Sequence, residues 1–104
     1  MIANVKNNLE KIINTCKDMQ LDSLYLFGSA ARENDFNKTS DIDFLYKFKI
    51  DKDGLPASGY DYFDLLFKLE EITGKKVDLV ANEKLSNPYL ISSIEEDKIK
   101  IYEA

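Results

Sequence analysis

The sequence contains no histidine and only one cysteine, and these two scarcities exclude several kinds of site. Cys16 cannot form an internal disulfide, and a zinc centre or a Ser/His/Asp triad lacks the imidazole side chains that such sites usually require. No stretch reaches the roughly 18 consecutive apolar residues that a membrane helix needs. We therefore expect a cytoplasmic protein that does not contact a membrane, in which any metal ion is held mainly by oxygen ligands.

Positive charge is also scarce. Fourteen lysine and arginine residues stand against 19 acidic residues, which gives a net charge of −5. A domain that clamps a long phosphate backbone is usually basic, so this balance disfavours nucleic acid as the main ligand and favours a basic or neutral partner. With 104 residues, of which 44% are apolar, the chain can bury one modest core. A single domain over residues 1–104 is therefore predicted.

Hydrophobic periodicity predicts an alternation of helices and strands. Apolar residues at spacings of three and four predict one opening amphipathic helix over residues 2–19, a helix over residues 62–73 capped by Gly74, and a last helix starting at Pro88. A short helix is predicted after Gly28, and residues 34–40 and 51–59 are predicted to be loops. Strands are predicted at residues 24–27, 42–48, 77–81 and 99–102. This order predicts an α/β (α+β) protein with one mixed sheet of about four strands and helices packed against it.

Two aspartates, Asp41 and Asp43, open the second predicted strand with one apolar residue between them. Side chains two residues apart in a strand lie on one face, so the two carboxylates point the same way. At about 4 Å they would repel by roughly 1 kcal/mol in water and about 4 kcal/mol near a protein surface. A cation, a shared proton or full solvation must offset that repulsion, and Mg²⁺ prefers such oxygen ligands. Lys47 or Lys49 are alternative partners for the two acids.

Asp78 is the one acid within the otherwise apolar segment 77–81. A charge at such a position is costly unless it is paired or bound to metal. One interpretation places Asp78 at the solvated end of the strand, paired with Lys75 or Lys76. The other places it beside the Asp-x-Asp pair on a neighbouring strand. Three carboxylates could then hold two metal ions for an in-line displacement at phosphorus, with Asp78 as the general base.

The segment after the first predicted strand has the features of a phosphate cradle. Gly28 lets the backbone approach a ligand closely, and Ser29 adds a hydroxyl to the N–H groups at the start of a short helix. The same Gly-Ser pair is also a common helix cap. Arg32, the one arginine of the chain, could contact phosphate oxygens through its planar guanidinium.

Taken together, these segments resemble the polymerase-beta-like nucleotidyltransferase superfamily, and most closely its minimal nucleotidyltransferase branch. The resemblance covers nearly the whole chain and rests on residues 26–32 (LFGSAAR), 40–45 (SDIDFL), 76–80 (KVDLV) and 87–102. It implies the nucleotidyltransferase fold, two Mg²⁺ ions, and transfer of a nucleoside monophosphate from ATP or another triphosphate to a hydroxyl. By position, Gly28, Ser29, Arg32 and Ser40 would bind the nucleotide. The catalytic residues and metal ligands would be Asp41, Asp43 and Asp78.

Members of that branch are often antitoxins paired with a HEPN-domain ribonuclease, which some of them silence by adenylylating a tyrosine, so the resemblance implies a HEPN-type toxin as the partner. Two alternatives remain open: an antitoxin that acts by contact alone, and a nucleotidyltransferase for small molecules of the antibiotic-modifying kind, whose acceptor pocket would need a second subunit. Glu33 departs from the family pattern, which usually has glycine there, and eleven residues separate Ser29 from Asp41 where ten are commoner. If the Glu33 carboxylate points inward, it will weaken nucleotide binding.

Overall fold

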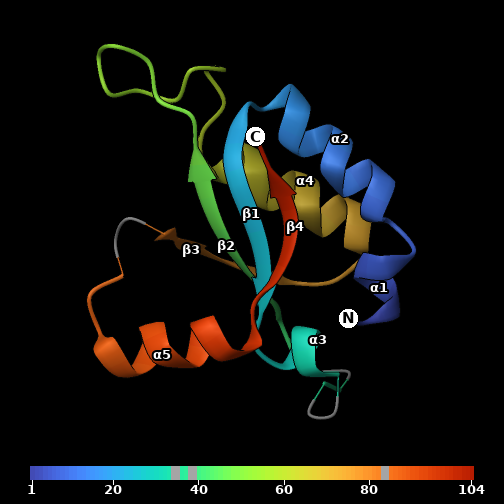
Figure 1. The fold of residues 1–104 in the computed structure, drawn as a ribbon. Coiled ribbons are helices and arrows are strands. Elements are labelled where there is room, and N and C mark those ends of the chain that lie inside the picture. The colour runs from blue at the N-terminus through green and yellow to red at the C-terminus, as the bar shows by residue number, and fades with distance from the viewer. Residues whose placement is uncertain (34–35, 38–39, 83–84) are drawn as a thin grey trace.

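A four-stranded mixed sheet forms the centre of the computed structural model, which describes residues 1–33, 36–37, 40–82 and 85–104 (Figure 1). The strand order is β3-β2-β1-β4, in which β1 pairs antiparallel with β2 and β4, and β2 pairs parallel with β3. This arrangement confirms the predicted fold class. The strands are β1 (Leu21–Phe27), β2 (Ile42–Phe48), β3 (Val77–Ala81) and β4 (Ile99–Glu103). The helices are α1 (Ala3–Lys6), α2 (Leu9–Asp18), α3 (Ser29–Arg32), α4 (Tyr62–Thr73) and α5 (Pro88–Asp97).

The two faces of the sheet are covered by different helices (Figure 1). Alternate strand residues, among them Ile42, Phe44 and Leu79, pack with α2 and α4 in the main core. Residues of the opposite parity, such as Phe27 and Leu45, pack against Ile94 of α5 in a smaller cluster. Because side chains alternate between faces along a strand, the aspartates of β2 and β3 lie on the α5 side.

The opening segment differs from the prediction, because it forms two helices instead of one. The break falls at Asn7 and Asn8, between α1 and α2. The Asn8 side-chain amide donates to the Asn4 carbonyl at 2.7 Å, and that of Asn4 donates to the Thr73 carbonyl at 2.8 Å. Asparagine side chains that bond to nearby backbone groups compete with the helical ladder, which the hydrophobic spacing alone does not reveal.

The predicted helix ends near the sheet are confirmed. Gly74 caps α4 in the left-handed conformation with φ of 69°, and Pro88 begins α5 after an Asn87 cap. The predicted loop at residues 34–40 falls partly on residues 34–35 and 38–39, which lie outside the described residues. None of the helices in the part of the chain that the structure describes has the length and apolar character needed to span a bilayer.

Candidate active site

The three predicted carboxylates come together because of strand pairing. In the parallel β2/β3 pair, Asp43 stands directly beside Asp78, and in the antiparallel β1/β2 pair it stands beside Phe27. Asp41 precedes β2 by one residue and shares the parity of Asp43. The Gly28 turn follows Phe27 at once, so the acids and the predicted phosphate cradle lie at the same end of the sheet.

The electrostatics of Asp43 show how closely these acids interact. Partial burial of the side chain, followed by the negative charges of Asp78 and then Asp41, raises the pKa of the Asp43 carboxyl from 3.8 to about 6. The positive charge of Arg32 acts in the opposite direction, and a hydrogen bond between the Asp43 and Asp78 side chains raises the pKa further. The repulsion predicted between neighbouring acids is therefore present in the fold.

The carboxylates of Asp41, Asp43 and Asp78 are the donors available for the predicted metal site. In the ranges that the structure describes, no group of three or more His, Cys, Asp or Glu side chains already has the arrangement of a metal site. The donor chemistry nevertheless fits Mg²⁺, which is bound through a few carboxylate oxygens together with water and phosphate. The raised pKa of Asp43 reflects negative charge that a cation would offset.

Gly28 is required by its surroundings as well as by its backbone. Its φ of 72° lies in the left-handed region that favours glycine. A Cβ atom built at this position would collide with the Asp43 carboxylate oxygen Oδ2. The Gly28 carbonyl accepts hydrogen bonds from the N–H groups of Ala31 and Arg32 at 3.1 and 3.2 Å, which begins α3 with Ser29 in its first turn. The turn thus packs directly on a carboxylate of the acid cluster.

Arg32 makes a contact that the sequence does not reveal. Its guanidinium Nη1 donates to Asp97 Oδ2 at the end of α5, and the two residues form an ion pair across 65 positions of sequence. The same arginine lowers the pKa of Asp43, which places its charge near the acids. Asp97 was missed because a single acid at the end of an amphipathic helix has no distinguishing pattern.

The remaining predicted positions are occupied as follows. The Ser40 hydroxyl accepts a hydrogen bond from the Asn37 N–H at 3.1 Å. Glu33 adopts a positive φ of 71°, and its carboxylate lies 3.5 Å from the N-terminal ammonium. Of the alternative partners for the acids, Lys47 pairs with Asp22 at 3.7 Å.

This fold and this cluster of acids beside a Gly-Ser turn define a nucleotidyltransferase. A family model described as "Nucleotidyltransferase domain" matches residues 9–101, and the chain belongs to this family, in its minimal nucleotidyltransferase branch. Two proteins of Methanocaldococcus jannaschii, each named "putative protein adenylyltransferase", are 38% identical to the chain over 101 residues, which cover 96% of this chain and 97% of each relative. The family and these relatives identify the chain as an enzyme of the nucleotidyltransferase class.

Solved structures agree with this assignment. A structure described as a "putative minimal nucleotidyltransferase" superposes with a TM-score of 0.68 at 26% identity, over 91% of this chain and 90% of that chain. A toxin-antitoxin crystal structure with AMP-PNP gives 0.66 at 26% identity, over 93% and 74%. A tri-AMPylated HEPN toxin of Shewanella oneidensis in complex with an MNT antitoxin gives 0.60 at 25% identity, over 95% and 72%.

Proposed function

We propose that this protein transfers AMP from ATP to a hydroxyl group on a partner protein, in a Mg²⁺-dependent reaction, and that the partner is a HEPN-type toxin. The observation that carries this proposal is the pairing of Asp43 with Asp78 beside the Gly28 turn. Support for the acceptor comes from the relatives named as protein adenylyltransferases and from the neighbour in which a HEPN toxin is AMPylated.

Asp41, Asp43 and Asp78 would hold two Mg²⁺ ions. Bound Mg²⁺ supplies charge neutralisation on the phosphate oxygens and lowers the pKa of the attacking hydroxyl. The N–H groups at the start of α3 and the Ser29 hydroxyl bind the triphosphate at the Gly28 turn. Ser40, which directly precedes Asp41, also contacts the nucleotide. Arg32 contacts a phosphate oxygen through its guanidinium.

The transfer itself forms one bond and breaks one. The acceptor oxygen attacks the α-phosphorus, the bond from that phosphorus to the bridging oxygen breaks, and pyrophosphate leaves. Asp78 takes the proton of the attacking hydroxyl. It suits this role because β3 is an edge strand and the Asp78 side chain is exposed, so a hydroxyl on another protein can reach it.

The test combines the purified chain, ATP, Mg²⁺ and the HEPN-type product of a neighbouring gene, and follows the intact mass of that product. We expect a gain of one or more AMP groups, which Asp41→Asn, Asp43→Asn and Asp78→Asn each abolish. Asp22→Asn is the matched control, because Asp22 is a strand carboxylate that pairs with Lys47 outside the acid cluster.

Two results would replace this proposal. Inhibition of the partner that persists without ATP and in all three aspartate variants would indicate an antitoxin that acts by contact alone. Labelling of an aminoglycoside, with no labelling of the protein partner, would indicate a nucleotidyltransferase for small molecules.

A further inference from the structure

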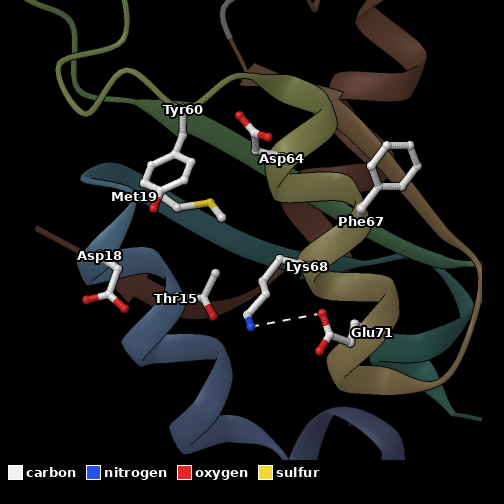
Figure 2. Close-up of a pocket in the computed structure, with 8 residues that line it drawn as sticks. All are labelled: Thr15, Asp18, Met19, Tyr60, Asp64, Phe67, Lys68 and Glu71. Carbon is white, nitrogen blue, oxygen red and sulfur yellow. Dashed lines mark ion pairs between the residues drawn. The ribbon is translucent and has the colours of Figure 1, made fainter.

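A groove runs between α2 and α4 (Figure 2). These helices cover the side of the sheet opposite to the acid cluster. Its volume is about 410 Å³, enough for a few side chains of another molecule. Apolar and acidic side chains of the two helices and of the residues next to their ends, Met19 and Tyr60, share its walls. The α2/α4 groove is lined by Thr15, Asp18, Met19, Tyr60, Asp64, Phe67, Lys68 and Glu71.

An aromatic face continues from this groove over the outer side of α4. We use the term aromatic face for Phe63 and Phe67, whose side chains are 58 and 60% exposed. Phe63 and Phe67 are one helical turn apart, and their rings stack with centroids 6.1 Å apart. Single exposed apolar residues are normal, but adjoining exposed aromatic rings next to a groove are typical of a protein-protein contact.

The surroundings of this surface are strongly negative. Residues 50–72 contain six acidic residues and two lysines, so this segment contributes four of the five net negative charges of the chain. Within the groove, Asp18, Asp64 and Glu71 stand against one lysine, Lys68, which pairs with Glu71 at 4.0 Å. An occupant that places apolar side chains in the groove will therefore meet carboxylates at the rim, and it needs positive charge there.

We propose that the α2/α4 groove and the aromatic face form the docking surface for a basic amphipathic helix of a partner protein. Leucine-like side chains of that helix enter the groove, and its lysine or arginine side chains pair with the acidic rim. A second copy of this chain fits poorly, because the same patch placed on itself brings like charges together. Nucleic acid is disfavoured for the same electrostatic reason.

This docking surface deepens the proposed function, and it rests on that function for the identity of the partner. The acids lie on the α5 side of the sheet, whereas the groove lies between the helices that cover the other side. Capture of the partner and transfer of AMP are therefore separate events on separate surfaces. Substitutions at one surface should leave the other intact.

The direct test uses two synthetic helical peptides with the same leucine face, one with lysine and one with glutamate on the polar face. We expect the lysine peptide to bind the full chain at least about tenfold more tightly at low salt, measured by fluorescence anisotropy. Phe63→Ser with Phe67→Ser should weaken that binding roughly tenfold. Tyr89→Ser is the matched control, since Tyr89 is an aromatic residue of α5 that is 86% exposed and outside the patch.

A second variant reverses the charge of the rim, and a reversed peptide preference cannot result from loss of folding. Asp18→Lys with Glu71→Lys should shift the preference toward the glutamate peptide. Equal binding of both peptides, no binding of either, or no effect of the two serine substitutions would overturn the proposal. A dimer of the chain alone that the serine substitutions dissociate would also overturn it and identify a second copy as the occupant.

The two proposals fail in different ways. Asp43→Asn should abolish AMP transfer and leave binding of the lysine peptide unchanged. Phe63→Ser with Phe67→Ser should keep ATP binding but slow transfer to the protein partner. Peptide binding without any transfer activity would support the docking surface and contradict the proposed reaction.

Discussion

Asp43 and Asp78 stand side by side on two parallel strands, although 35 positions of sequence separate them. Partial burial and then the negative charge of Asp78 raise the pKa of the Asp43 carboxyl to about 6. A pair of this kind weakens the fold at neutral pH unless a proton or a cation offsets its charge.

The first prediction concerns stability and pH without divalent cations. The pKa of Asp43 is about 6 in the fold against 3.8 for the free group, so between these values the folded chain holds a proton that the unfolded chain has released. The contribution of Asp43 to the free energy of unfolding must then fall as pH rises from about 4 to about 6. Because this group is half exposed, the loss is about 1 to 2 kcal/mol after solvent screening.

Asp43→Asn should therefore be more stable than the wild type above pH 6 and similar to it near pH 4. Melting temperatures of both proteins, measured by circular dichroism in EDTA across this range, check the difference. Asp22→Asn serves as the control for loss of one surface carboxylate. A difference between wild type and Asp43→Asn that is constant with pH would contradict the assignment.

The second prediction concerns Mg²⁺. If the acid cluster holds the ion, millimolar Mg²⁺ will raise the melting temperature of the wild type at pH 7.5, because a ligand that binds only the folded state stabilises it. Asp43→Asn should lose most of this response, and Asp22→Asn should keep it. An equal response of all three proteins would mean that the ion binds elsewhere.

The third prediction concerns Gly28. Gly28→Ala combines a left-handed φ with a collision against Asp43, so it should abolish transfer and lower the free energy of unfolding by about 1 to 3 kcal/mol. Gly54→Ala is the matched control, because its φ is 80° but an added Cβ would meet nothing within 4 Å. That variant should lose some stability and keep its activity. Urea titration and the mass assay separate the two effects, and full activity of Gly28→Ala would count against the cradle.

The fourth prediction concerns Asp97 as a positioning residue. Its ion pair holds the Arg32 guanidinium near the acids, so Asp97→Asn should raise the KM for ATP about threefold to tenfold with a smaller change in kcat. The effect of Asp97→Asn should vanish in an Arg32→Gln background, which removes the positive charge, and a double-mutant cycle measures this coupling. Glu95→Gln, on the same helix and paired with Lys98, is the control. Additive effects of the two substitutions would show that Asp97 acts independently of Arg32.

The fifth prediction concerns Glu33, which has a φ of 71° and a ψ of −40°. This conformation is costly for a residue with a side chain, so Glu33→Gly should stabilise the fold by about 1 kcal/mol. Glu33→Ala also removes the carboxylate but keeps the strained backbone, and it should not stabilise. Thermal unfolding of both variants provides the comparison, and equal stability of the glycine and alanine variants would exclude backbone strain as the cause.

Local patterns were enough to predict most elements of this fold. The alternation around Asp43 placed it on the face opposite to Phe44, and Gly74 and Pro88 marked helix ends correctly. The prediction started β1 three residues late, at residue 24 instead of Leu21, because a bulge between Leu21 and Ser23 interrupts the alternation.

Local sequence patterns therefore predict the set of strands, their inner and outer faces, and the chemical types of side chain that could form a site. Periods of 2 and 3.6 residues are local properties, and each segment carries them independently. Only the folded arrangement of the whole chain shows that Asp78 lies beside Asp43, that Asp97 pairs with Arg32, and that Tyr60 and Phe67 border a groove. Those relationships depend on strand register and helix packing, which follow from burying one common core and not from any single segment.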